Sequence, residues 1–438
     1  MGLLKEKRLF GDAFWALFGQ LASAIALLAG TRILTELVTP DTYGQVALLN
    51  GFVALGVSLF SYPFICAGMR ILPECQNRLE RADLHGVVVG LTARSTTLAI
   101  IVLVSGGAVY GYLTHNDSWL FALAGVLLAV TVRRELGIQL LIGERRQRGA
   151  SLWQTTDSIL RPVLSISLVW YLGRQAEWIL LGYILASLVS NTVWSLIQRV
   201  KADDNKERRP VRSRNFRRDV LAYALPLIPM ELVFWLNGLG DRYVIGYMMT
   251  AADVGLYAAT YLIINEAFNR SAMVLLRTFQ PAYFQHCSQN RMKEGFKLLW
   301  LWIGCVIAMG IIGVSLLLLT KDWVAALLLA KSYHSAVALM PAIAVGSALH
   351  ALGTVVAQPL LADKRTRLFL LGRVCGAVAA VISIPLMVKY YGLLGAAMAN
   401  PIYYGVELLV LALLARPWRV LRSEPKDEIE ESGCSATA

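Results

Sequence analysis

Long runs of apolar residues, separated by short polar breaks, repeat along the whole chain. A helix needs roughly 20 apolar residues to cross the hydrocarbon layer of a bilayer, and most of these runs approach or exceed that length. The fourth run stops at Arg133-Arg134-Glu135 or continues through Leu136–Ile142, and the pattern leaves both endings open. The pattern predicts twelve helices, over residues 10–31, 43–66, 86–112, 118–132, 150–172, 177–198, 220–248, 253–276, 297–320, 337–361, 368–388 and 393–415.

Composition agrees with this pattern. The 438 residues are 57% hydrophobic and only 16% charged. Soluble domains are about 45–50% apolar and about 25% charged. We therefore expect an all-α integral membrane protein. The formal net charge of +12 gives no reason to expect a nucleic-acid partner, because a basic excess in a membrane protein usually lies in its cytoplasmic loops.

The basic residues are divided very unevenly between the two sides of the predicted helices. Of the 41 Lys and Arg residues, 31 lie in the N-terminus, the C-terminal tail and every second loop, whereas the six remaining loops hold five. Loops rich in Lys and Arg stay in the cytoplasm. Both termini are therefore predicted to be cytoplasmic.

A basic segment near the midpoint, residues 199–219, predicts a linker between two halves of six helices each. The halves are residues 1–198 and 220–415. Residues 416–438 form a polar tail of few aromatic residues, for which we expect disorder. The six cysteines show no metal-ligand spacing, so we interpret them as reduced and structural, and no metal or cofactor is expected.

The two halves share a local pattern. Arg32 and Arg242 each lie near the end of the first helix of a half, 210 positions apart. Gly44 and Gly255, 211 positions apart, each open the next helix after a Thr and an Asp. Repeats of six helices begin on the same membrane side, so an axis along the membrane normal would relate them. This arrangement predicts a central cavity between the halves.

Several predicted helices carry charges that are expensive within a bilayer. An arginine at the centre of a membrane helix costs at least about 2.5–3.5 kcal/mol. Such charges should face a wet cavity or one another. The arginines are Arg94, Arg161, Arg242, Arg270 and Arg373, and the acids are Asp157, Glu231, Asp241, Glu266 and Glu407.

Spacing and depth separate these charges. Asp157 and Arg161 are four residues apart near mid-helix, which favours a cavity position. Glu266 and Arg270 have the same spacing near a helix end, where a structural pair and a functional one are both open. Arg94 has no acid on its own helix, so it needs a partner from another helix or an anion. For Arg373, close to a cytoplasmic helix end, we expect the side chain to extend to the headgroups: a position without function.

The seventh predicted helix is the richest in candidate residues. Pro226 and Pro229, in LPLIPME, should bend or unwind it. Glu231 lies three helical turns before Arg242, on roughly the same face. Asp241 points about 100° away from Arg242, so it cannot neutralise that arginine on one face. A guanidinium group matches phosphate oxygens with two hydrogen bonds, which indicates an anionic substrate.

Four segments together resemble a known family. NGLGDRYVIGYMMTAADVGLYAATYLI, the preceding LPLIP, TPDTYGQVAL after the first helix and YYGLLGAAMANPI opening the twelfth resemble Wzx-type flippases of polysaccharide repeat units. These belong to the multidrug/oligosaccharidyl-lipid/polysaccharide (MOP) exporter superfamily. Asp241 and Arg242 occupy the place of the family's Asp-Arg pair, and Arg32 and Gly44 occupy the corresponding place in the first half.

The resemblance implies a non-enzymatic transporter in the bacterial inner membrane. It would move an undecaprenyl-pyrophosphate-linked oligosaccharide from the cytoplasmic to the periplasmic leaflet, for O-antigen, capsule or exopolysaccharide synthesis, by ion-coupled alternating access. No GxxxxGK[ST] phosphate loop is present. Other polysaccharide-assembly membrane proteins stay open as partners. The predicted cavity residues are Arg242, Arg32, Arg94, Arg161 and Arg270, of which Arg94, Arg161 and Arg270 are chosen by depth, and the predicted ion-coupling or arginine-orienting residues are Asp241, Glu231, Asp157 and Glu266.

Three alternatives remain open. A multidrug exporter of the same superfamily would need a more acidic and aromatic cavity. A membrane polymerase or glycosyltransferase would need substantial outer loops, whereas the longest one here is roughly Lys321–Ala336. A flippase for the cell-wall precursor would usually have more than twelve helices.

Overall fold

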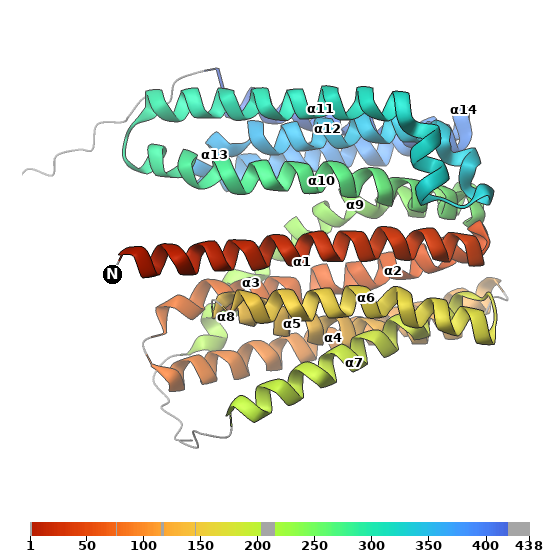
Figure 1. The fold of residues 1–438 in the computed structure, drawn as a ribbon, viewed down its shortest axis with the longest axis horizontal. Helices are drawn as coiled ribbons and strands as arrows, with labels where there is room; N and C mark the ends of the chain where they lie inside the picture. Colours follow the sequence, from red (N-terminus) through yellow and green to blue (C-terminus); the bar gives the residue numbers. More distant parts are fainter. Residues whose placement is uncertain (1, 76, 115–117, 145, 203–214, 419–438) are drawn as a thin grey trace, which may run out of the picture.

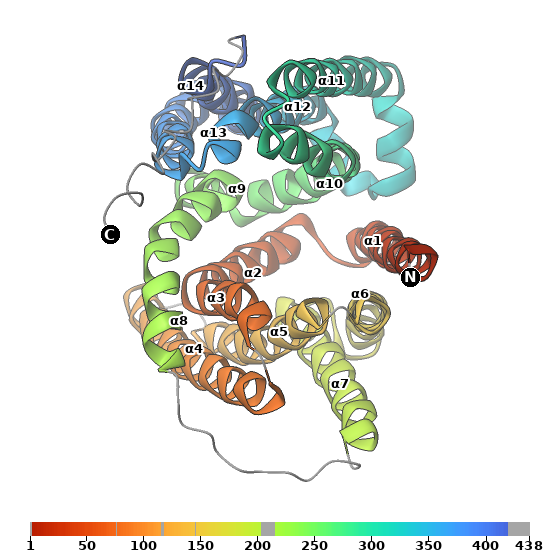
Figure 2. The same ribbon diagram turned by 90° about the vertical axis from the view of Figure 1, so that its left-hand side faces the viewer.

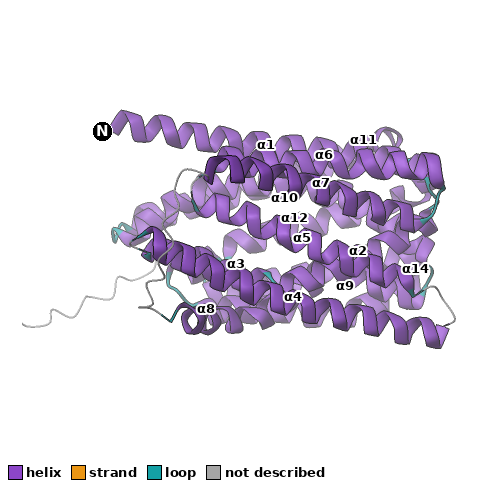
Figure 3. Ribbon diagram, turned by 90° about the horizontal axis from the view of Figure 1, so that it is seen from below, coloured by secondary structure: helices purple, strands orange, loops and turns teal. Residues whose placement is uncertain are grey.

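The computed structural model describes residues 2–75, 77–114, 118–144, 146–202 and 215–418, and the described chain is helical throughout (Figures 1 and 3). The first elements are α1 (Gly2–Leu37), α2 (Pro40–Phe60), α3 (Tyr62–Ile71), η1 (Leu72–Glu74), α4 (Arg78–Thr114), α5 (Trp119–Gly143), α6 (Gln147–Leu172) and α7 (Ala176–Ala202). After the central segment come α8 (Phe216–Ala224), η2 (Leu225–Leu227), α9 (Ile228–Met248), α10 (Ala251–Ser288), α11 (Met292–Leu328), η3 (Lys331–Leu339), α12 (Met340–Val356), α13 (Gln358–Ala362) and α14 (Thr366–Ala415).

The helices coincide with the predicted apolar runs. α5 continues to Gly143, so Arg133, Arg134 and Glu135 lie within a helix and do not begin a loop. The last two predicted helices form α14, which breaks at Gly392, where φ is 58°. Within the described residues, eight helical stretches are long and apolar enough to cross a membrane. Twelve crossings, with both termini in the cytoplasm, stay a prediction.

The two ends of the bundle differ in their exposed side chains. We call the end where α1 begins the basic end, because exposed Lys and Arg residues gather there: Arg81, Arg146, Arg277, Arg291, Lys293, Arg365 and Arg367. The opposite end, on the right in Figure 1, is the aromatic end. Its exposed residues include Tyr112, Trp170, Tyr171, Tyr247, Trp323 and Tyr390. Aromatic residues of this kind favour membrane–water interfaces.

Two groups of helices lie side by side, α1–α7 and α9–α14, which we call the N-terminal and C-terminal groups (Figure 2). Each has its own apolar core, centred on residues such as Leu127 and Leu180 in the first and Tyr257 and Met340 in the second. α2 packs against α9 and α10 of the C-terminal group, and α1 makes smaller contacts with α10 and α11. Whether the groups act as separate domains stays a prediction.

The short helix α8 packs on the N-terminal group, although it begins the second half of the chain. Phe216 and Val220 are buried against residues of α3 and α4, including Phe64 and Leu84. The 3-10 turn η2 then separates α8 from α9, with Pro226 inside the turn and Pro229 in the first turn of α9. Of the predicted linker, residues 203–214 lie outside the described residues, as do residues 419–438 of the tail.

α2 and α10 begin in the same way. Thr39 and Thr250 cap them, and each threonine hydroxyl oxygen accepts a hydrogen bond from a backbone N–H three residues later, at 3.4 and 3.2 Å. Such caps satisfy backbone donors that a helix start leaves unpaired. Gly44 and Gly255 each follow five residues after the cap, so the repeated sequence pattern corresponds to a repeated local structure.

Candidate functional site

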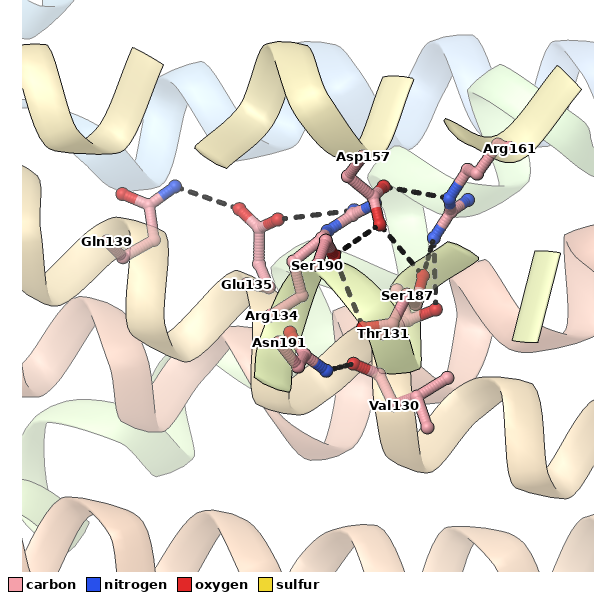
Figure 4. Close-up of polar contacts among 10 residues, drawn as sticks. All are labelled: Val130, Thr131, Arg134, Glu135, Gln139, Asp157, Arg161, Ser187, Ser190 and Asn191. Carbon is pink, nitrogen blue, oxygen red and sulfur yellow. Dashed lines mark hydrogen bonds and ion pairs between the residues drawn. The ribbon is translucent and has the colours of Figure 1, made fainter. Parts of the chain in front are cut away.

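Asp157, in α6, is the centre of a buried polar network (Figure 4). The residue is 1% exposed, and its carboxylate is paired with Arg134 of α5 and, at 2.8 Å, with the Nε of Arg161. The hydroxyls of Ser187 and Ser190, in α7, donate to the same carboxylate at 3.0 and 3.1 Å. Two guanidinium groups and two hydroxyls from three helices thus converge on one carboxylate, which joins α5, α6 and α7.

The charges of this network balance. Arg134 also lies 3.7 Å from the carboxylate of Glu135, so two guanidinium groups face two carboxylates. Arg161 donates a further hydrogen bond to Ser187, at 3.1 Å. The sequence pointed to Asp157 and Arg161 but not to Arg134, which the apolar pattern leaves at the edge of a loop. The apolar residues after Glu135 were the available signal, because a continued helix carries Arg134 inward.

Arg373 does not extend to the headgroups, so that expectation was wrong. Its side chain is buried, 5% of the residue being exposed, and its Nη1 donates to the carboxylate of Glu407 at 2.6 Å. Both residues belong to α14 but to opposite sides of its break, where the chain folds back. The hydroxyl of Thr354 accepts a hydrogen bond from Arg373 at 3.1 Å. The side-chain amide of Asn237, in α9, donates to the backbone carbonyl of Arg373 at 3.2 Å. This pair therefore joins α9, α12 and α14.

Asp241 is fully engaged with the C-terminal group. It is 2% exposed, and its carboxylate accepts a hydrogen bond from the hydroxyl of Tyr257 at 2.5 Å. Asn400 of α14 donates to the same tyrosine oxygen at 2.8 Å. The other carboxylate oxygen accepts from the backbone N–H of Arg242 at 2.8 Å. Asp241 consequently fastens α9 to α10 and, through Tyr257, to α14.

Arg242 has no carboxylate partner among the described residues. Its Cζ lies 5.2 Å from the ring centroid of Tyr261, and its Nε is buried without a hydrogen bond. On the other side it is within electrostatic range of Tyr43, in α2 of the N-terminal group. The guanidinium group therefore lies between the two groups beside aromatic rings and forms no ion pair within the described chain, although the neighbouring Asp241, which Tyr257 holds, is within its electrostatic range.

The other candidate arginines differ from Arg242. Arg32 forms an ion pair with Glu36. Arg270 donates from Nε to Glu266 at 2.6 Å and from Nη1 to the carbonyl of Gln20 at 2.8 Å, which links α10 to α1. Both arginines therefore have carboxylate partners on their own helices.

Arg94 is exposed on α4 and forms no ion pair or hydrogen bond within the described chain. Leu98 and Ile101, on the same face of α4, are also exposed. This is an apolar surface of the kind that lipid covers, and it sets Arg94 apart from arginines in polar networks.

Glu231 is buried, being 8% exposed, in the first turn of α9. No hydrogen bond or ion pair holds its carboxyl group in the part of the chain that the structure describes. Tyr62 and Cys66, in α3 of the N-terminal group, are within its electrostatic range. Among the described residues, the seventh predicted helix thus carries an acid at one end and an arginine near the other that form no ion pair.

The comparisons with known proteins place this geometry in a family. Residues 9–276 match the model of the family described as polysaccharide biosynthesis protein, which is more than half of the chain. The chain belongs to this family. No curated protein matches the chain.

Solved structures with the same fold are transporters and a flippase. An inward-facing multidrug resistance MATE family transporter of the MOP superfamily has a TM-score of 0.72 at 17% identity, over 91% of this chain and 93% of that chain. Lipid II flippase MurJ, in an inward closed conformation, has a TM-score of 0.66 at 12% identity, over 92% and 87%. A point mutant of the Vibrio cholerae MATE transporter VcmN has a TM-score of 0.61 at 14% identity, over 96% and 97%. The resemblance drawn from the sequence motifs is confirmed, and the protein is a multi-pass membrane protein with a MOP-transporter fold.

Proposed function

We propose that the protein moves a lipid-linked oligosaccharide repeat unit, carried on undecaprenyl pyrophosphate, across the bacterial inner membrane for polysaccharide synthesis. The single observation that carries this proposal is Arg242, a guanidinium group between the two helix groups that forms no ion pair within the described chain. Leaving such a charge unpaired within a membrane is expensive. A substrate that brings pyrophosphate or an acidic sugar to Arg242 would supply the missing charge and two matching oxygens.

Orientation follows from the same proposal. The basic end lies in the cytoplasm and the aromatic end at the periplasm, as the distribution of Lys and Arg predicts. Arg242 is six residues from the aromatic end of α9, so it would meet the anionic headgroup near the exit side.

Energy would come from an ion gradient, and Glu231 is the residue that we propose for ion exchange. A buried carboxyl group without a protein partner can bind and release a proton or a cation, because no fixed positive charge competes for it. Asp241 and Asp157 are less suitable, since both are held by several donors. We assign Asp241 a positioning role, with Tyr257 holding the segment that presents Arg242.

The experiment replaces Arg242 by Gln, Lys and Glu in the native host. We expect Arg242→Glu to abolish surface polysaccharide and to cause the lipid-linked unit to accumulate on the cytoplasmic side, while immunoblots show normal amounts of protein in the membrane. Arg242→Lys should retain part of the activity, because it keeps the charge but loses the paired hydrogen bonds. Arg367→Gln, at an exposed arginine of the basic end, is the matched control and should be silent. Full complementation by Arg242→Glu would overturn the proposal.

A multidrug exporter is the second candidate, and Glu231 is the observation that favours it. An unpartnered buried acid suits a cationic drug as well as a coupling ion. Cells that overproduce the protein would then exclude a cationic dye such as ethidium, and Glu231→Gln would remove that effect. Unchanged dye accumulation together with loss of surface polysaccharide in the null strain would exclude this candidate.

A further inference from the structure

At the aromatic end, α2 of the N-terminal group runs against α9 and α10 of the C-terminal group. The hydroxyl of Tyr243 donates to the carbonyl of Leu48 at 2.9 Å, and the indole N–H of Trp235 donates to the carbonyl of Gly51 at 2.9 Å. Both acceptors are backbone atoms of α2. Two aromatic side chains of α9 therefore hold α2 along the seam between the groups.

Nearer the end of this seam, the backbones of α2 and α10 touch. A Cβ atom added to Gly44 would lie 1.8 Å from the carbonyl oxygen of Ala251. A Cβ atom added to Gly255 would lie 1.9 Å from the carbonyl oxygen of Pro40. Real Cβ atoms do not approach a backbone oxygen so closely, and backbone, unlike a flexible side chain, cannot turn aside. Each helix thus needs a glycine at the crossing for the other to reach its place.

The two glycines are equivalent positions of the internal repeat. Each follows five residues after a capping threonine, and each faces the first turn of the opposite helix. The crossing is therefore nearly symmetric, with one glycine from each half of the chain. A third link lies close by, where the backbone N–H of Ala330, before η3, donates to the hydroxyl of Thr35 in α1 at 3.3 Å.

We propose that the crossing of Gly44 and Gly255 is the outer gate of the transporter. This inference rests on the proposed function, because a substrate that passes between the groups can leave at the aromatic end only if this contact parts. The two glycines make the closed position possible, since any larger residue would hold α2 and α10 apart.

The test measures access to the seam from outside the cell. Leu48, whose side chain packs between the groups near Gly246, is replaced by Cys as the reporter, and intact cells are treated with a membrane-impermeant maleimide. With the native glycines we expect slow labelling. Gly44→Ala and Gly255→Ala exclude the closed position, so labelling of Cys at position 48 should become at least about tenfold faster, as expected when the closed population is removed.

Matched controls come from glycines where an added Cβ meets nothing within 4 Å. Gly238, in α9, and Gly106, in α4, meet this condition. In the Gly238→Ala and Gly106→Ala variants, the cysteine at position 48 should be labelled as slowly as in the parent with the native glycines. Unchanged slow labelling in both Gly44→Ala and Gly255→Ala, with normal amounts of protein in the membrane, would overturn the gate.

A second measurement does not depend on folding of the glycine variants. Thr35→Cys combined with Ala330→Cys places two thiols across the same seam, and their disulfide would hold the gate closed. We expect oxidation to stop export and reduction to restore it, whereas each single variant should be insensitive. Undiminished export by the fully cross-linked protein would also overturn the gate. Labelling does not depend on the substrate, so the gate can hold even if Arg242→Glu shows that the proposed substrate is wrong.

Discussion

The network around Asp157 and the surroundings of Arg242 use the same type of side chain in opposite ways. In the network, Arg134 and Arg161 share a carboxylate, and hydroxyl groups complete the hydrogen bonding. At Arg242, aromatic rings lie close to the guanidinium group, and the adjacent Asp241 is occupied by Tyr257. The difference indicates that the first region fixes helices relative to one another, whereas the second keeps a charge available for a ligand.

Stability measurements test this difference between the two regions. Removing one member of a balanced, buried network leaves other charges unpaired and should destabilise the protein. Removing a charge that has no partner leaves nothing behind and should cost little. The replacements below follow the expected loss of stability, from the largest to the smallest.

Asp157→Asn should have the largest effect. It leaves Arg134 and Arg161 without the carboxylate between them, and we expect the free energy of unfolding to fall by about 3–5 kcal/mol. Unfolding of the purified protein in detergent, followed by tryptophan fluorescence, measures this loss. Asp41→Asn is the control, because Asp41 is exposed and its carboxylate binds the side chain of Gln45. Equal stability of the two variants would show that the network has no structural role.

Glu407→Leu should come next. It removes the partner of Arg373, and we expect a loss of about 3 kcal/mol. The double variant Arg373→Met with Glu407→Leu removes both charges, so it should be more stable than Glu407→Leu alone when both are measured in the same unfolding experiment. A double variant that is less stable than the single one would contradict the pairing.

Tyr257→Phe should have an intermediate effect. It removes the hydroxyl that donates to Asp241 and accepts from Asn400, and a buried acceptor left without its donor costs about 1–3 kcal/mol. The expected result is a lower unfolding temperature and a partial loss of export, since the segment that presents Arg242 is less firmly held. Tyr247→Phe, at a residue that is 92% exposed, should change neither quantity.

Arg242→Gln should have the smallest effect on stability and a severe effect on export. Its free energy of unfolding should fall by no more than about 1 kcal/mol, because the substitution breaks no ion pair and removes only the contact with the ring of Tyr261. The same purified protein and the same host strain provide both measurements. A loss as large as that of Asp157→Asn would mean that Arg242 has a structural partner after all.

Interactions within one helix were predictable from the sequence, and those between helices mostly were not. The four-residue spacing pointed to Asp157 with Arg161 and to Glu266 with Arg270, because such residues share a helix face. Arg134 joins the network only through the packing of α5 against α6, which one helix cannot reveal. For Asp241, the angle from Arg242 showed that the two would not pair on one face, but its partner Tyr257 lies on another helix.

The pairing of Arg373 with Glu407 can be inferred from the depths of the two residues in their predicted helices. Residues 368–388 and 393–415 were predicted as consecutive helices that run in opposite directions. Arg373 lies about five residues from the start of the first, and Glu407 about eight residues from the end of the second, so their depths match. Two opposite charges at equal depth on neighbouring helices should be paired before either is assumed to extend to the surface.

The position of α8 limits how the protein can move. Phe216 and Val220 are embedded in the N-terminal group, while the chain beyond the proline-containing turn η2 belongs to the C-terminal group. The two groups are therefore joined by the continuous backbone of α8, η2 and α9. Rotation of one group relative to the other therefore requires either bending at η2 or loss of the contacts between α8 and the N-terminal group. Bending at η2 would allow the two groups to rotate relative to each other, while the covalent connection through α8 limits how far they can separate in the plane of the membrane.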